Sequence, residues 1–249
     1  MQLLVSVADG REARAALAGG ADVIDAKDPG RGALGAVRPA VLVAIRDAVG
    51  SARPVSAALG DARDERAVAQ AARAAAARGV AFVKLGFAGV ASEERARRVA
   101  AAARHGAGEG EGEGVGTGAE VVLVAYADWL RAGSLAPERL VAVAVAARAA
   151  GMLLDTALKD ASLFGRVALE AVGAWVRVVH EAGMFACLAG SLGGADLATA
   201  RALGADLVGV RGAACVGGRT GRVARARVAA LRALARPAFP ALPTPPALV

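Results

Sequence analysis

Lysine is the residue type most indicative of catalytic chemistry in this chain, because it is rare here. Lysine and arginine together number thirty in 249 residues, and only Lys27, Lys84 and Lys159 are lysines. Arginine stays protonated, whereas a buried lysine can lose its proton and act as a nucleophile or a base. We therefore expect the lysines to do carbonyl chemistry, chiefly a Schiff base on Lys27, with a second lysine as acid–base group.

Carboxylates accompany these lysines at short spacings. Asp25 and Lys27 are two residues apart, so on a strand their side chains share one face. Asp155 comes four residues before Lys159. A carboxylate there can hold an ammonium in place or shuttle its proton, and neighbouring ammonium groups depress one another's pKa. The alternative for each pair is a purely structural ion pair.

Two glycine-bearing segments are suited to a phosphate. Gly190 and Ser191 follow one apolar run, and Arg211, Gly212 and Ala213 follow the next. Glycine lets backbone N–H groups approach an anion closely, and an arginine can clamp it with two parallel hydrogen bonds. We predict that these five residues bind a substrate phosphate, with Arg211 as the clamp.

A strand–helix repeat is expected to position these groups. Eight short apolar runs are predicted strands: residues 2–6, 22–27, 54–59, 80–85, 120–126, 152–156, 184–189 and 206–210. This alternation predicts an α/β fold, a single (β/α)8 barrel, with an open doubly wound sheet as the alternative. A dinucleotide-binding open sheet would need GxGxxG after its first strand, where this chain has Ala8-Asp9-Gly10. Barrel active sites lie at the C-terminal strand ends, with phosphate after strands seven and eight, which is where these residues fall.

The helices are predicted from their start and stop signals. Residues 9–18, 64–78, 92–104 and 137–150 are strongly helix-forming, with Asp, Ser or Pro near their starts. Glycines before the strands, among them Gly151, Gly183 and Gly204, are the expected helix C-caps.

The barrel is expected to span residues 1–235. Residues 105–118, rich in glycine and glutamate, are predicted to be a flexible loop, and the proline-rich residues 236–249 a disordered tail.

Several classes of protein are disfavoured. No apolar run is long enough to cross a bilayer, and the N-terminus lacks the features of a signal peptide, so we expect a cytoplasmic protein. Two cysteines and two histidines without ligand spacing predict no metal site. The net charge of +7 comes from scattered arginines without an aromatic platform, which disfavours nucleic-acid binding.

Seven segments together resemble one known family. They are residues 25–29 running on to 32–36, residues 55–57 with 60–61, and residues 83–86, 125–128, 154–160, 188–191 and 208–215. In this combination and order the sequence resembles the (5-formylfuran-3-yl)methyl phosphate synthases, enzymes of methanofuran and methylofuran biosynthesis in one-carbon metabolism.

The resemblance implies a reaction and roles for the lysines. It implies that two glyceraldehyde 3-phosphate molecules condense into a phosphorylated hydroxymethyl-furaldehyde, with loss of phosphate and water and without a cofactor or metal. It further implies that Lys27 forms the Schiff base and Lys84 accepts a proton, with Asp25, Asp155 and Lys159 in the same site. The alternatives are another Schiff-base aldolase acting on a sugar phosphate, or a non-catalytic anion- or nucleic-acid-binding protein. A homo-oligomer is compatible with either enzyme.

Overall fold

The chain folds into a closed barrel of eight parallel strands, as predicted. A computed structural model describes residues 1–62, 64–108 and 118–236. The barrel strands are β1 (Gln2–Val7), β2 (Val23–Ala26), β3 (Val55–Asp61), β4 (Phe82–Gly86), β5 (Glu120–Tyr126), β6 (Gly151–Asp155), β7 (Phe185–Leu188) and β8 (Leu207–Val210). Each strand pairs in parallel with the next, and β8 pairs with β1 to close the ring.

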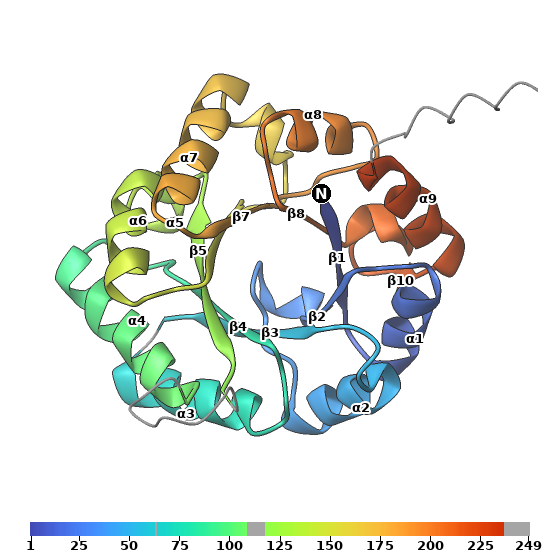
Figure 1. The fold of residues 1–249 in the computed structure, drawn as a ribbon, viewed down its shortest axis with the longest axis horizontal. Helices are drawn as coiled ribbons and strands as arrows, with labels where there is room; N and C mark the ends of the chain where they lie inside the picture. The colour runs from blue at the N-terminus through green and yellow to red at the C-terminus, as the bar shows by residue number, and fades with distance from the viewer. Residues whose placement is uncertain (63, 109–117, 237–249) are drawn as a thin grey trace, which may run out of the picture.

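Helices surround the strands, as Figure 1 shows in a view down the barrel. They are α1 (Gly10–Ala18), α2 (Pro39–Val49), α3 (Glu65–Ala76), α4 (Glu93–Gly106), α5 (Trp129–Ala132), α6 (Pro137–Ala146), α7 (Leu169–Glu181), α8 (Asp196–Ala202) and α9 (Arg225–Ala235). The loops carry 3-10 turns η1 (Pro29–Arg31), η2 (Leu163–Gly165) and η3 (Gly212–Ala214), and a hairpin of β9 (Cys215–Val216) and β10 (Arg222–Val223).

Two apolar clusters result from the alternation of side chains along each strand. On β5, Val121 and Leu123 face the helices and belong to the large cluster between helices and sheet. Val122, Val124 and Tyr126 belong to a smaller cluster that fills the barrel. A filled interior leaves the mouth of the barrel as the place for a ligand.

Local sequence signals explain most of the element boundaries. The side chains of Asp9, Asp64 and Ser92 cap α1, α3 and α4 by accepting a hydrogen bond from a backbone N–H, as their residue types predict. Gly183 and Gly204 follow their helices with positive φ, at 75° and 87°.

The predicted C-cap at Gly151 is wrong. Gly151 is the first residue of β6, and the positive φ of that connection lies at Arg148, at 48°. A Cβ on Gly151 would lie 2.4 Å from the ring of Phe185 on the neighbouring strand. Gly151 is therefore required by side-chain packing between strands, a contact that the local sequence does not reveal.

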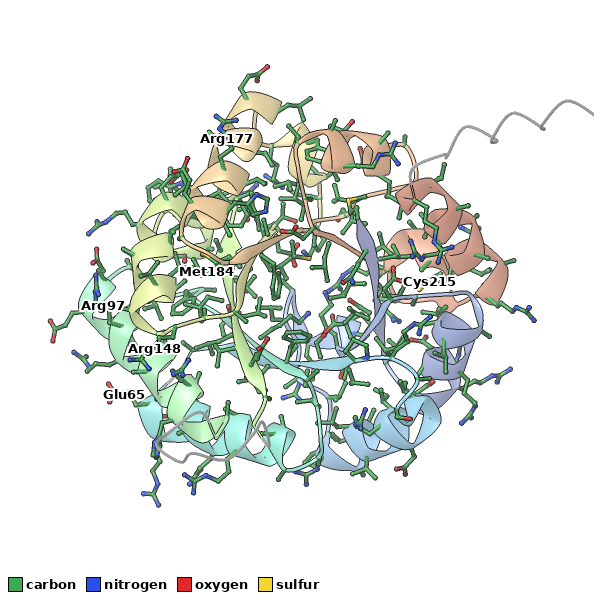
Figure 2. The ribbon with its side chains drawn as sticks, viewed as in Figure 1. Glu65, Arg97, Arg148, Arg177, Met184 and Cys215 are labelled. Carbon is green, nitrogen blue, oxygen red and sulfur yellow. The ribbon has the colours of Figure 1, made fainter. Side chains whose placement is uncertain are left out.

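The surface agrees with the interpretation of the charge as solvated helix faces. Arg97 on α4 and Arg177 on α7 are exposed and point away from the ring in Figure 2. No helix of the described residues is long and apolar enough to cross a membrane. Most of the predicted loop and tail, residues 109–117 and 237–249, lies outside the described residues.

Candidate active site

One cavity of about 320 Å³ opens at the C-terminal end of the barrel. All ten residues predicted for the site line this cavity: Asp25, Lys27, Lys84, Asp155, Lys159, Gly190, Ser191, Arg211, Gly212 and Ala213. They come from β2, β4 and β6 and from the loops that follow β2, β6, β7 and β8. The structure therefore brings the lysine cluster and the glycine segments together, as the barrel topology predicts.

Asp25 is the centre of the polar network beneath the cavity. Its carboxylate accepts hydrogen bonds from Ser6 Oγ on β1 and Ser56 Oγ on β3, each at 2.8 Å. Lys84 Nζ on β4 lies 2.7 Å from the same carboxylate, and Asp25 has no exposed surface. Asp25 thus pairs with Lys84, whereas the strand spacing had suggested Lys27 as its partner.

Electrostatics favours the charged form of Asp25. Burial raises the pKa of this carboxyl, but the positive charges of Lys84 and Lys27 and the hydrogen bonds from Lys84 and Ser56 outweigh burial, so the pKa lies below its ordinary value. An ionised Asp25 therefore keeps a counter-ion beside Lys84, which is only 2% exposed.

Lys84 lies deeper than predicted. Strand β4 continues to Gly86, so Lys84 is its central residue and not its last. Its side chain reaches both the active-site cavity and a small apolar cavity inside the barrel, where Phe82 and Cys187 are neighbours. Lys84 therefore borders both the active-site cavity and the barrel interior.

Lys27, just beyond the end of β2, has the surroundings of a nucleophile. It is 8% exposed and forms no ion pair within the described part of the chain. Burial is the main cause that lowers its pKa to about 8; Lys84 and Lys159 lower the pKa further, and Asp155 and Asp25 partly oppose them. With this pKa, roughly a tenth of Lys27 is uncharged at pH 7, and this fraction rises with pH.

Asp155 and Lys159 form a second ion pair in the lining of the same cavity. Lys159 Nζ lies 2.5 Å from Asp155 Oδ1 and also donates to the backbone oxygen of Thr156. Burial raises the pKa of Asp155, but the charges of Lys159 and Lys27 and the hydrogen bonds from Lys159 and Thr156 bring it below the ordinary value. Lys159 is therefore a proton donor nearer to solvent than Lys84, since its side chain is 19% exposed and that of Lys84 only 3%.

The segment after β7 has the unusual backbone of a binding loop. Ser191 has φ 53°, a left-handed value that costs a non-glycine residue roughly 1–2 kcal/mol. Gly190 has φ 104°, and a Cβ there would lie within 3.2 Å of Thr156. Such strain is typical of ligand-binding loops, which supports the predicted role of Gly190 and Ser191.

The predicted phosphate clamp at Arg211 is wrong for this structure. Arg211 is 7% exposed, and its guanidinium forms an ion pair of 2.8 Å with Glu12, a buried residue of α1. Its remaining N–H groups donate to the backbone oxygens of Ser6, Arg219 and Gly221. The five donors of Arg211 are used inside the protein, because the side chain turns toward α1 and the β9–β10 hairpin instead of the cavity centre.

Comparison with known proteins decides the family. Residues 3–232 match the family described as 4-HFC-P synthase. The chain is 42% identical over 225 residues to the (5-formylfuran-3-yl)methyl phosphate synthase of Methanopyrus kandleri, covering 90% of this chain and 93% of that protein. It is 38% identical over 224 residues to the synthase of Methanococcus maripaludis, covering 88% and 91%. The chain belongs to this synthase family.

Solved structures confirm the fold. The chain resembles 3-hexulose-6-phosphate synthase from Salmonella typhimurium with a TM-score of 0.62 at 16% identity, over 95% of this chain and all of that one. Phosphoribosyl anthranilate isomerase from Thermus thermophilus gives 0.59 at 15% identity, over 94% and 98%. At these low sequence identities the similarity shows a shared barrel fold and nothing more.

Sequence reasoning missed several functional neighbours in this synthase-family chain. Ser6 and Ser56, which hold Asp25, could have been found because each lies at an inward-facing position of a predicted strand. Arg219 lines the cavity from the turn between β9 and β10. Nothing in the local sequence distinguishes Arg219 from the other arginines.

Other reactive groups are sparse near the site. Among the described residues, no cluster of three His, Cys, Asp or Glu side chains is arranged to hold a metal ion. Cys187 is buried below Lys84, and burial raises the pKa of its thiol to about 12, so it stays protonated. Among the residues that line the cavity, three lysines and two carboxylates can take up or give a proton.

Proposed function

We propose that this protein is a cytoplasmic (5-formylfuran-3-yl)methyl phosphate synthase that joins two glyceraldehyde 3-phosphate molecules through a Schiff base on Lys27. The observation that carries the proposal is a buried lysine with a pKa of about 8 inside a cavity lined by two further lysines. The names of the relatives support the activity. Under the proposal the product would serve methanofuran-type cofactor synthesis.

The first step uses the uncharged amine of Lys27. Its Nζ attacks the aldehyde carbon, and loss of water gives a protonated imine. The imine withdraws electrons and acidifies the neighbouring carbon, so a base can remove a proton there. We assign that proton transfer to the uncharged form of Lys84, and Asp25 at 2.7 Å stabilises the ammonium that results.

Loss of phosphate follows from the enamine that remains. Its electron pair expels phosphate from the adjacent carbon, and this carbon is then electrophilic toward the α-carbon of the second triose phosphate. Ring closure and loss of two waters give the furan, and hydrolysis of the imine takes back the water lost in the first step and frees Lys27. Two substrates therefore yield one phosphorylated product, one phosphate and two waters overall. Lys159, paired with Asp155 at the rim, is placed to donate protons to the departing groups.

Borohydride trapping tests this proposal. The protein is incubated with glyceraldehyde 3-phosphate, reduced with borohydride, digested and mapped by mass spectrometry; a reduced adduct on Lys27 is expected. The matched control is Lys27→Arg, which keeps the positive charge but cannot form an imine, and should show no adduct and no furan absorbance.

Other outcomes would change the proposal in distinct ways. An adduct on Lys84 or Lys159 would exchange the roles of the lysines. Trapping on Lys27 together with reversible aldol exchange, but without furan or free phosphate, would indicate a different Schiff-base aldolase. A folded protein without any adduct would remove the Schiff-base mechanism.

A further inference from the structure

Most of the charged side chains around the cavity, but not all of them, have an ion-pair partner. Three ion pairs account for most of its charged side chains: Lys84–Asp25, Lys159–Asp155 and Arg211–Glu12. Within the described residues, Lys27 and Arg219 line the cavity without a carboxylate in ion-pair distance. Lys27 is occupied by the proposed imine, which leaves Arg219 as the cation with a charge to offer an anionic ligand.

A rigid support carries Arg219. It lies in the tight turn between β9 and β10, where Gly217 and Gly218 have φ values of 85° and 74°. A Cβ on Gly221 would lie 1.9 Å from the backbone oxygen of Val216, so the turn is closely packed. A guanidinium on such a support loses little further freedom when a ligand binds.

The buried Arg211 holds this turn against the barrel. Arg211 Nε donates to the backbone oxygen of Arg219 at 2.8 Å, and Nη2 donates to that of Gly221 at 3.2 Å. The other end of the guanidinium is held by Glu12 and by the backbone oxygen of Ser6 at the end of β1. Arg211 therefore connects the floor of the cavity to the backbone that bears Arg219.

The side chain of Arg219 also reaches the loop that follows Lys27. Its two terminal nitrogens donate to the backbone oxygens of Pro29 at 2.5 Å and Gly32 at 2.7 Å. Backbone oxygens are neutral acceptors, so these contacts orient the guanidinium without cancelling its charge. A guanidinium has five N–H donors, so donors remain for a ligand.

We propose that Arg219 binds the substrate phosphate from the β9–β10 turn, and that Arg211 and Glu12 position it. The phosphate would lie between Arg219 and the segments at Gly190–Ser191 and Gly212–Ala213, which line the same cavity. Arginine suits this role because its planar fork matches two phosphate oxygens. This inference rests on the proposed function only in taking a phosphate ester as the ligand.

Inorganic phosphate is the probe for the test, because its binding requires no imine. Calorimetric titration of the whole chain should show that Arg219→Ala weakens phosphate binding about tenfold or more, the loss of a charge-assisted contact. Arg219→Lys should recover part of the affinity. The matched control is Arg222→Ala in the same hairpin, an exposed arginine paired with Asp9, which should bind phosphate like the wild type.

A separate variant tests the positioning role of Arg211. Arg211→Lys keeps the charge but loses donors to the turn, so it should weaken phosphate binding, and the effect should largely vanish in the Arg219→Ala background. Equal effects of Arg211→Lys in both backgrounds would show that Arg211 does not act through Arg219.

Two results would overturn the assignment of Arg219. One is unchanged phosphate affinity in Arg219→Ala with a lowered Tm, which would indicate only a structural link between the hairpin and the loop after β2. The other is a wild-type protein that does not bind phosphate. Phosphate binding that depends on Arg219, combined with failure of borohydride trapping, would instead reject the Schiff base and keep this inference.

Discussion

At the scale of single residues, burial of the charged groups makes the site reactive and at the same time lowers the stability of the folded protein. Lys27 is held largely out of water without an ion-pair partner in the described chain, which lowers its pKa to about 8 from an ordinary 10.5. The same burial that produces a reactive amine makes its protonated form unfavourable in the folded state. Active sites commonly sacrifice stability in this way.

Replacement of Lys27 by methionine should therefore stabilise the protein while abolishing activity. One pKa unit corresponds to about 1.36 kcal/mol, so at pH 7 the free energy of unfolding should rise by up to roughly 3 kcal/mol. Between pH 8 and 10.5 the unfolded wild type binds more protons than the folded form, so wild-type stability rises with pH and the difference should shrink. Denaturant titration at pH 7 and pH 10 measures this; a Met variant less stable than the wild type at pH 7 would contradict it.

Asp25 should show the opposite behaviour, because it neutralises a buried cation. Asp25→Asn leaves the ammonium of Lys84 without its carboxylate in the barrel interior, which should cost about 3–5 kcal/mol of unfolding free energy. The double variant Asp25→Asn with Lys84→Met should recover most of this loss. A single variant as stable as the wild type would mean that Lys84 is uncharged in the folded protein.

At the scale of elements, a side-chain hydrogen bond that spans β4 connects β3 with β5. Tyr126 on β5 donates to Asp61 Oδ1 on β3 at 2.6 Å, and the N–H of Ala88 donates to the same oxygen. Gly86 on β4 lies beneath this bond, and Leu34 from the loop after β2 packs beside it. These contacts fill the β3–β5 side of the mouth, so the cavity opens toward β6, β7, β8, β1 and β2.

Gly86→Ala should disturb this arrangement. The added Cβ would lie 2.3 Å from Asp61 Oδ1 and 2.7 Å from the hydroxyl of Tyr126, so the hydrogen bond must move. Overpacking of this kind costs about 1–3 kcal/mol. The control is Gly165→Ala in η2, where the nearest atom would be 3.4 Å away; it should change stability little in the same denaturation experiment. Equal stabilities for the two variants would show that the mouth accommodates the extra carbon.

At the scale of the whole molecule, the charge of +7 lies partly in the cavity and partly on scattered helix faces. Arg97 pairs with Glu93 four residues earlier, and Arg98 pairs with Glu65 and Glu94, so much of the basic surface is interleaved with acid. A nucleic-acid footprint needs clustered basic residues facing one strand of phosphates. The paired arginines of α4 show a different pattern.

We therefore expect no specific attraction to nucleic acids. Fluorescence anisotropy with duplex DNA and with single-stranded RNA should show no binding near physiological ionic strength, and only weak, salt-sensitive binding at low salt. The small anion phosphate is the comparison, since it should bind in the cavity under the same conditions. Tight nucleic-acid binding with a steep salt dependence would point to a second function for the basic surface.

Sequence alone predicted the eight strands, a barrel in preference to an open sheet, and the ten site residues that line one cavity. These follow from short-range patterns: alternation places Asp25 and Lys27 on one face, and a closed barrel brings all strand ends together. Only the tertiary structure decided which charged side chains form ion pairs with one another. The partner of Asp25 is Lys84 on a strand two positions away, and Arg211 turns to Glu12, 199 residues distant in the chain. The choice of ion-pair partners depends on strand register, on the depth of each side chain and on its direction, which no local spacing specifies. Because the other charged groups pair in this way, Lys27 and Arg219 remain available to a ligand.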